Sequence, residues 1–182
     1  MPSRIALCGL AGSGKSTAAD FLVLRHGFKR LSYASPIKRM LRSLLIEAGA
    51  GFIEAAEMTD GKLKELPTPF LCGHSPRYAL QTLGTEWGRD ILAQDIWRRI
   101  LINKSNKFSE LPLVVDDLRF PNEAEALREE GFLIVRVIRA GSGRDSAHSS
   151  EQQEFPVDVT ILNDGLVSQL ESRLSLLLAP NS

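Results

Sequence analysis

The sequence predicts a three-layer α/β fold, in which a parallel sheet is flanked by helices on both faces. Short apolar runs alternate with stretches of helical periodicity along the whole chain. One of these runs, LPLVVDD, is continuously apolar up to its two carboxylates, as expected of a parallel strand buried on both faces. No internal repeat and no Ser- or Pro-rich linker divides the chain, so we expect one domain over residues 1–182.

The composition is that of an ordinary globular protein. Hydrophobic residues make up 43% and charged residues 24% of the chain, which argues against disorder. Lys+Arg 22 and Asp+Glu 22 cancel, whereas a protein that binds duplex nucleic acid is more often strongly basic. No signal peptide precedes the first apolar run, and no apolar stretch nears the roughly 18 residues of a membrane helix. Cys8 and Cys72 are the only cysteines, and without metal-like spacing they indicate a reducing compartment. Together with the lack of a signal peptide and of a membrane helix, this leads us to expect a cytoplasmic protein.

The first part of the chain is expected to hold two strands and two helices. RIALCG (Arg4–Gly9) is a short apolar run that ends in glycine, typical of a buried strand in which Cys8 is a small core residue. Residues 15–27 carry apolar side chains at helical spacing and end in a glycine, and residues 28–34 are a second strand candidate. Pro36 suits the first turn of an amphipathic helix that continues to about residue 49.

The middle of the chain is expected to be mostly helical. Residues 49–76 are irregular in pattern, and we expect short helices and loops there. Residues 76–105 have a helical period, but Gly84 and Gly88 fall in the middle, where we expect a break or kink between two helices. The continuous apolar run at residues 111–117 then predicts a strand.

The alternation continues to the end of the chain. Pro121 begins a helix, and FLIVRVIR (residues 132–139) is the next predicted strand. Residues 140–156 are polar and glycine-rich, which is typical of a mobile loop or lid. VDVTILND (residues 157–164) predicts the last strand, and residues 166–178 form the closing helix.

The loop after the first strand has the pattern of a phosphate-binding loop. Gly9, Gly14, Lys15 and Ser16 occupy the fixed positions of G-x-x-x-x-G-K-[ST], between a strand and a helix as that motif requires. Glycines let backbone N–H groups turn toward phosphate oxygens, and the helix N-terminus adds a partial positive charge. Lys15 can bridge the β- and γ-phosphates, and Ser16 can give its hydroxyl to Mg²⁺. The candidate phosphate-binding residues are Gly9, Ala11, Gly12, Ser13, Gly14, Lys15, Ser16 and Thr17.

Two carboxylates end a strand that we expect beside the glycine loop. Ligands of doubly wound sheets bind outside the carboxyl ends of the strands, so Asp116 or Asp117 can hold the hydration shell of Mg²⁺ opposite Ser16. The alternative is that an aspartate here only caps the following helix. Arg119 could reach a phosphate at the same edge, or be a surface charge.

The long helical segment carries a polar face. Arg77 and Gln81 are one turn apart and could offer a guanidinium to a phosphate and an amide to a nucleobase, with Arg89 beyond the glycines. The alternative is a solvated face without a ligand. Trp87 and Trp97 are more often packing residues than base-stacking ones.

The predicted lid carries further charged residues. Arg139 and Arg144 could bring positive charge over a migrating phosphoryl group while the lid excludes water. His148 is interpreted as a hinge or hydrogen-bonding residue of the lid, and Glu151 as its anchor.

Other nucleotide-binding classes fit less well. A GTPase would carry an N-K-x-D motif for the base, which the sequence lacks. A motor ATPase is usually longer and has a D-E pair after its strand, whereas this strand continues as DDLR. The pattern therefore favours a phosphotransferase.

Several segments, in order along nearly the whole chain, resemble the deoxynucleoside monophosphate kinases of the bacteriophage type. They are LCGLAGSGKSTAADFL, YASPIKRML, RYALQTLGTEWGRDILAQDIW, DDLRFPNEAEAL, HSSEQ and ILNDG. The resemblance implies a P-loop kinase fold of the nucleoside-monophosphate-kinase type, with a mobile lid at about residues 140–156 and a helical acceptor-binding segment at about residues 36–104. It also implies transfer of the γ-phosphoryl group of ATP to a deoxynucleoside monophosphate, with Mg²⁺.

The resemblance assigns roles residue by residue. Lys15 and Ser16 match the P-loop lysine and the hydroxyl on the metal side, and Asp117 and Arg119 match the D-x-R of the family. Asp116 is an additional acid, so which aspartate faces the metal stays open.

The residues implied for each site can be grouped by role. The implied catalytic residues are Lys15, Asp117, Arg119 and Arg144, and Arg139 is implied to bind ATP together with the glycine loop. The implied metal site comprises Ser16 and Asp117. The implied acceptor site comprises Lys38, Arg77, Gln81, Arg89, Asp95 and Trp97.

Alternatives differ in the acceptor. The chain could be a P-loop kinase of another small phosphorylated molecule, of the dephospho-coenzyme A or phosphomevalonate type. It could also be a nucleotide-binding switch, or a kinase that acts on modified bases in DNA. The zero net charge argues against an action on DNA. The sequence leaves open the base and sugar of the acceptor, and whether the chain forms a homodimer.

Overall fold

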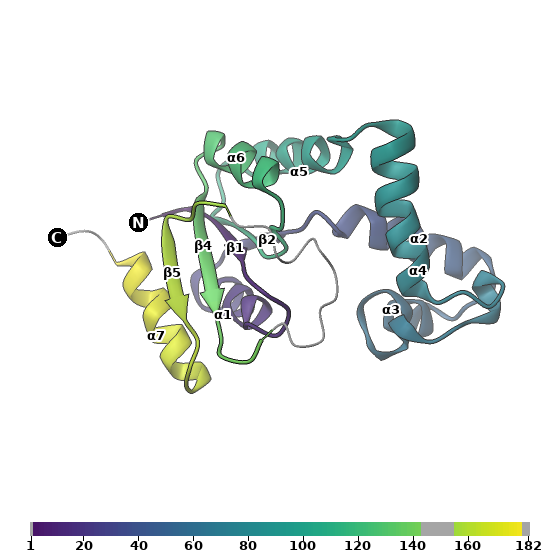
Figure 1. Ribbon diagram of the computed structural model, residues 1–182, viewed down its shortest axis with the longest axis horizontal. Coiled ribbons are helices and arrows are strands. Elements are labelled where there is room, and N and C mark those ends of the chain that lie inside the picture. The colour runs from purple at the N-terminus through teal and green to yellow at the C-terminus, as the bar shows by residue number, and fades with distance from the viewer. Residues whose placement is uncertain (1, 143–154, 180–182) are drawn as a thin grey trace. The chain divides into compact units, whose positions relative to one another are not determined.

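The computed structural model describes residues 2–142 and 155–179, which form two compact units. The first unit comprises Met1–Ser32 and Leu101–Ser182, and the second comprises Tyr33–Ile100. The first unit contains the sheet and the second is helical (Figure 1). The second unit is therefore an insertion in the chain of the first.

The sheet of the first unit has five strands in the order β2-β3-β1-β4-β5, and every neighbouring pair is parallel. The predicted parallel α/β sheet is thus confirmed. The paired segments are shorter than the apolar runs because only residues with a partner on the next strand belong to the ladder. The strands are β1 (Arg4–Cys8), β2 (Lys29–Leu31), β3 (Leu113–Val115), β4 (Leu133–Ile138) and β5 (Val159–Leu162).

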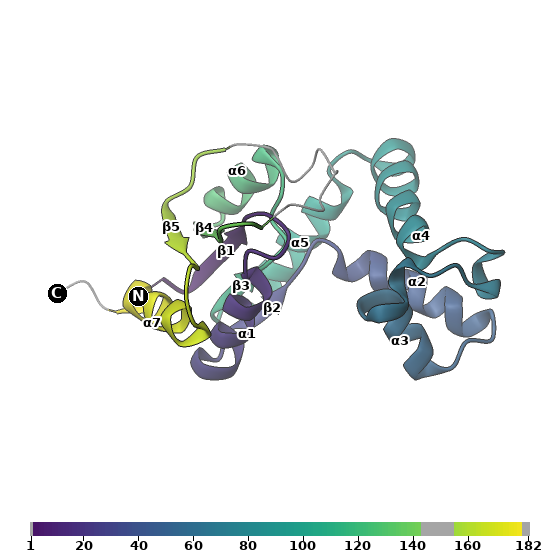
Figure 2. The same cartoon turned by 60° about the horizontal axis from the view of Figure 1, so that its bottom comes forward.

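Helices cover both faces of this sheet, as the three-layer prediction requires. α1 (Lys15–His26) and α7 (Val167–Leu178) lie on one face, and α6 (Pro121–Glu129) and the end of α5 (Ile96–Lys107) lie on the other (Figures 1 and 2). Alternate strand residues face the two layers, since side chains of a strand point to opposite sides. The core between the sheet and the first pair of helices comprises Ile5, Leu7, Ala18, Ala19, Leu22, Phe28, Val114, Val135, Val137, Ile161, Leu170, Leu174 and Leu178.

The second unit is built from short helices around its own apolar cluster. The irregular pattern after residue 49 contains one α-helix and two 3₁₀ helices, as expected. The cluster comprises Leu41, Leu45, Ala50, Ala55 and Met58. The helices are α2 (Ser35–Glu47), α3 (Phe52–Asp60), η1 (Lys62–Glu65), η2 (Pro69–Leu71) and α4 (Pro76–Thr82).

The expected break at the two glycines is wrong. α4 continues without interruption into a π-helix, η3 (Leu83–Leu92), and the chain becomes extended only at Ala93. Gly88 serves close packing instead, because a Cβ there would lie 2.3 Å from Cζ2 of Trp97. The indole Nε1 of Trp97 donates a hydrogen bond of 2.7 Å to the carbonyl of Gly84. Gly88 thus makes room for a tryptophan of which only 3% is exposed, and the carbonyl of Gly84 accepts its hydrogen bond.

The predicted lid falls largely on residues 143–154, which lie outside the described residues. The proposed roles of Arg144, His148 and Glu151 therefore stay predictions. Among the residues that the structure does describe, no helix is both long and apolar enough to span a membrane.

Candidate active site

The glycine loop connects β1 to α1 and needs glycine at two positions for different reasons. Gly9 has a φ of +139°, and a Cβ there would lie 2.3 Å from the carbonyl oxygen of Val137 on the neighbouring strand. Gly14 has a φ of +104° immediately before the first residue of α1. Side chains at these positions would be strained or would clash, so the loop owes its shape to glycine.

Lys15 and the start of α1 give the loop its positive character. Nζ of Lys15 donates hydrogen bonds to the carbonyls of Gly9 at 2.7 Å and Leu10 at 2.8 Å. Ser16 and Thr17 are exposed in the first turn of α1, where backbone N–H groups have no partner within the helix. An ammonium group, two hydroxyls and a helix N-terminus are therefore concentrated in one loop, which suits a phosphate group.

The two aspartates lie at the same edge of the sheet as the loop. β3 runs parallel to β1 with Ala6 opposite Val115, so Asp116 and Asp117 follow β3 where the glycine loop follows β1. Oδ2 of Asp117 accepts a hydrogen bond of 2.8 Å from the hydroxyl of Ser32, which follows β2. Three neighbouring strands thus contribute to one edge, as expected for a doubly wound sheet.

Asp116 and Asp117 have different surroundings. Asp116 forms a salt bridge with Arg30, and its side chain is only 10% exposed. The hydrogen bond that Arg30 donates to the carboxylate of Asp116 raises the pKa of Arg30, whose guanidinium also pairs with Asp20 at 2.8 Å. A positive charge therefore already balances Asp116. Neither Arg30 nor Ser32 was identified from the sequence, because their partners lie far away along the chain.

The start of α6 is held by a glutamate. The carboxylate of Glu123, 5% exposed, accepts hydrogen bonds of 3.2 Å from the backbone N–H groups of Arg119 and Phe120. The side chain of Arg119 is exposed at the edge where the strands end. Arg139 is exposed immediately after β4, at the same edge.

The second unit gathers cations that the sequence separates. Lys38 pairs with Asp60 at 2.8 Å, and Arg77 pairs with Glu65 at 2.7 Å. Lys64 is partly buried beside them, and its burial, together with the charges of Arg77 and Lys38, lowers its pKa to about 8. Lys38 and Arg77 were predicted from the sequence, whereas Lys64 was missed because its pattern is that of a solvated loop lysine.

The other predicted acceptor residues are placed as follows. Gln81 is exposed on α4, and Arg89 is partly buried in η3. Asp95 pairs with Arg99 at 2.8 Å and Arg98 at 3.0 Å, and hydrogen bonds from these two side chains lower the pKa of Asp95. Asp95 thus forms local ion pairs at the beginning of α5.

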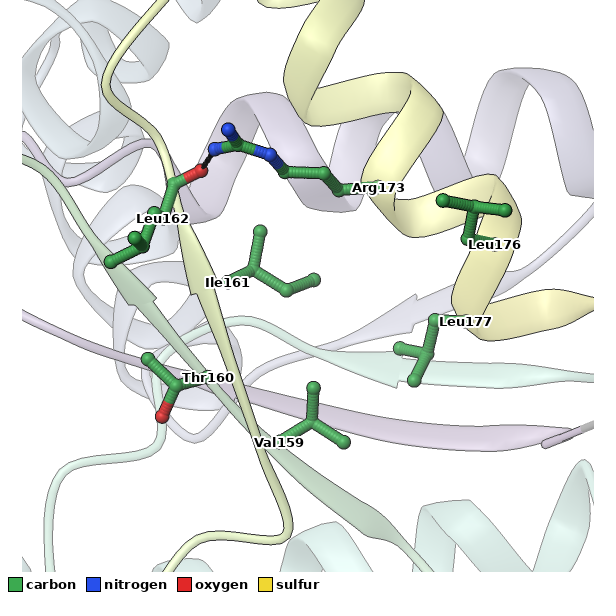
Figure 3. Close-up of a pocket in the computed structure, with 7 residues that line it drawn as sticks. All are labelled: Val159, Thr160, Ile161, Leu162, Arg173, Leu176 and Leu177. Carbon is green, nitrogen blue, oxygen red and sulfur yellow. Dashed lines mark hydrogen bonds between the residues drawn. The ribbon is translucent and has the colours of Figure 1, made fainter.

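A groove of about 520 Å³ lies in the first unit, between the edge strand β5 and α7 (Figure 3). It contains none of the residues predicted from the glycine loop or the aspartates. Most of its side chains are apolar, which does not suit a phosphate group. Its lining residues are Val159, Thr160, Ile161, Leu162, Arg173, Leu176 and Leu177.

Comparisons with known proteins agree on one family. The model of the deoxynucleotide monophosphate kinase family matches residues 72–174. A putative deoxynucleotide monophosphate kinase of Acanthamoeba polyphaga mimivirus is 29% identical over 187 residues, which cover 93% of each chain. The deoxynucleoside-5'-monophosphate kinase of Escherichia phage T5 is 46% identical over 71 residues, which cover 36% of this chain and 28% of the phage protein.

A solved structure supports the fold. The crystal structure of TT1252 from Thermus thermophilus superimposes with a TM-score of 0.51 at 22% identity, covering 97% of this chain and 96% of that chain. At this identity the likeness concerns the fold alone.

Proposed function

Because this chain belongs to the deoxynucleotide monophosphate kinase family, we propose that it transfers the γ-phosphoryl group of ATP to a deoxynucleoside monophosphate and releases the diphosphate. The observation that carries this proposal is the family match over residues 72–174. That segment excludes the glycine loop, which many nucleotide-binding families share. The match therefore supports the reaction independently of the phosphate-binding motif.

The donor side of the reaction is assigned to the glycine loop. Gly9 and Gly14 hold the loop open for phosphate oxygens, and the N-terminus of α1 adds partial positive charge. Lys15 now binds carbonyls of its own loop, and would exchange them for the β- and γ-phosphates of ATP. Arg119 and Arg139 would add charge at the same edge.

The proposed metal site suits Mg²⁺ by the chemistry of its donors. The hydroxyl of Ser16 and the carboxylate of Asp117 are oxygen ligands, which Mg²⁺ prefers, and phosphate oxygens and water would complete its shell. Bound there, Mg²⁺ supplies neutralisation of charge on the phosphates. We assign this contact to Asp117 rather than Asp116, because Asp117 occupies the position of the acid in the D-x-R pattern of the family.

The acceptor side is assigned to the cations of the second unit. The charges of Arg77 and Lys38 lower the pKa of Lys64, so positive charge gathers around Lys64, and a bound anion would reduce this repulsion. The 5'-phosphate of a nucleoside monophosphate has the required charge of about −2 at neutral pH. Gln81 lies one helical turn from Arg77 and could hydrogen-bond the base.

The transfer step requires no covalent enzyme intermediate. An oxygen of the acceptor phosphate attacks the γ-phosphorus in line, and ADP leaves with the bridging oxygen. Lys15 and Arg119 stabilise the charge that shifts to the oxygens, and Arg144 is the candidate from the predicted lid. Catalysis then consists of positioning and charge neutralisation.

The reaction can be tested by a coupled assay for ADP release. The acceptors are dAMP, dCMP, dGMP, dTMP and their ribose counterparts, and Lys15→Ala is the matched control. We expect Lys15-dependent ADP release with at least one deoxynucleotide. Activity with dephospho-coenzyme A, phosphomevalonate or duplex DNA but with no free deoxynucleotide would contradict the proposal.

The setting of the reaction follows from its substrates. Nucleotides are small molecules of the cytoplasm, and we propose that the enzyme acts there on free nucleotides. The zero formal charge offers no electrostatic attraction to nucleic acid, in agreement with a free nucleotide as acceptor.

A further inference from the structure

Asn163 contacts the glycine loop although it lies at the opposite end of the chain. Its Nδ2 donates a hydrogen bond of 2.8 Å to the backbone carbonyl of Ser13, and the two residues are 150 positions apart. Asn163 is 7% exposed and Ser13 is fully buried. A buried amide of this kind is costly unless it is hydrogen-bonded, so this bond fixes both partners.

The backbone around Asn163 is itself held from two sides. Its N–H donates a hydrogen bond of 2.6 Å to the carbonyl of Ile138 at the end of β4. Arg173 of α7 donates to the carbonyl of Leu162, as Figure 3 shows, and pairs with Asp164 at 2.9 Å. Arg173 of α7 therefore holds the residues before and after Asn163 in place, and their fixed backbone sets the orientation of the Asn163 side-chain amide.

The amide also occupies space that glycine leaves free. A Cβ on Gly14 would lie 2.3 Å from Nδ2 of Asn163. The absence of a side chain at Gly14 thus allows the asparagine to reach the carbonyl behind the loop. Gly14 and Asn163 depend on each other in this respect.

We propose that Asn163 is a positioning residue of the ATP site, which orients the peptide between Ser13 and Gly14. A peptide unit is planar and trans, so its C=O and N–H point in opposite directions. With the carbonyl of Ser13 held by Asn163, the N–H of Gly14 points to the other side of the loop, where a phosphate oxygen can accept its hydrogen bond. This inference rests on the proposed function only in that the loop binds the phosphates of ATP.

The expected consequence is a selective loss of ATP affinity. Asn163→Leu keeps the number and branching of the side-chain heavy atoms but removes the donor, and Asn163→Asp keeps the shape but turns an oxygen toward the carbonyl of Ser13. Loss of one buried hydrogen bond that orients the loop should weaken ATP binding by about 10- to 100-fold. Thr160→Ala, on the exposed side of β5, is the matched control and should leave binding within twofold.

The test is equilibrium binding of ATP and ADP by calorimetry, with thermal unfolding of each variant and the acceptor KM as further readouts. We expect both nucleotides to bind more weakly to the folded Asn163 variants, while the acceptor KM stays within twofold. ATP affinity within twofold of wild type in either folded variant would overturn the proposal. So would an equal loss of ATP and acceptor affinity, which indicates general loosening. Binding of ATP does not require phosphoryl transfer. If the protein phosphorylated no deoxynucleotide, the proposed reaction would be refuted, but the test of ATP binding in the Asn163 variants would still apply.

Discussion

Lys64→Met tests whether the cations of the second unit bind the acceptor phosphate. Methionine keeps an unbranched stem in the partly buried position and removes the charge. If the ammonium contacts the 5'-phosphate, its loss removes a charge-assisted hydrogen bond worth about 1.5–3 kcal/mol, or roughly 10- to 150-fold in acceptor affinity. ATP affinity should change much less, because the proposal assigns the phosphates of ATP to the glycine loop.

The pKa of Lys64 makes this contribution depend on pH. With a pKa of about 8, Lys64 is charged in about nine molecules of ten at pH 7 and in about one of ten at pH 9. The phosphate has a second pKa near 6 and stays dianionic over this range. Wild-type acceptor affinity should therefore fall as pH rises above 8 and approach that of Lys64→Met, which should change little.

The lowered pKa of Lys64 also makes the stability of the fold depend on pH, and stability rises with pH whereas acceptor affinity falls. The pKa of Lys64 in the folded chain, about 8, is below its ordinary value of 10.5, so the folded state disfavours the charged form. This destabilisation is complete below pH 8 and is relieved as pH rises from about 8 to 10.5, where only the unfolded chain still binds the proton. Lys64→Met should accordingly raise Tm at pH 7 while it weakens the acceptor.

The measurements are acceptor KM and ATP KM between pH 6.5 and 9.5, with Tm at each pH. Lys62→Met, on an exposed neighbour in η1, is the matched control. If acceptor KM changed with pH in the same way for wild type and Lys64→Met, the reasoning would be refuted. The same holds if Lys64→Met weakened acceptor and ATP affinity equally.

Other substitutions test the donor side and the packing of the second unit. Lys15→Ala should abolish phosphoryl transfer with Tm unchanged, because Nζ of Lys15 lies in the glycine loop, where it donates to the carbonyls of Gly9 and Leu10; wild-type ADP release would contradict the role. Asp117→Asn should raise the Mg²⁺ concentration needed for half-maximal turnover more than Asp116→Asn does, and the reverse ranking would assign the metal contact to Asp116. Gly88→Ala should lower the free energy of unfolding by about 1–3 kcal/mol in urea denaturation, since its methyl group would overlap Trp97, and an unchanged midpoint would show that the indole can move.

The sequence predicted features that depend on local pattern. The alternating apolar runs predicted the parallel sheet, and the glycine spacing predicted the loop between β1 and α1. Strand ends were less accurate: residues 28–34 were expected as a strand, but only Lys29–Leu31 pair with β3. The bounds of a strand depend on its neighbour, which the segment itself does not reveal.

Features that depend on distant contacts could not be predicted. Asn163 meets Ser13 across almost the whole chain, and neither its place at the end of an apolar strand nor the segment ILNDG indicates that contact. The π-helix was missed because apolar spacing over so few residues does not distinguish i→i+5 from i→i+4 bonding. Gly88 was interpreted as a helix breaker, since its packing partner Trp97 could not be identified beforehand.

The insertion of the second unit between β2 and β3 affects the entropy of folding. These strands are neighbours in the sheet, and their pairing closes a loop that contains the whole of Tyr33–Ile100. As a flexible chain, such a loop loses conformational freedom on closure, at about 0.6 kcal/mol for each doubling of its length. Helices form from local contacts and need no such closure. An insert that is already folded shortens the flexible part of the loop, so its own rigidity reduces the entropic cost of adding β2 to the edge of the sheet.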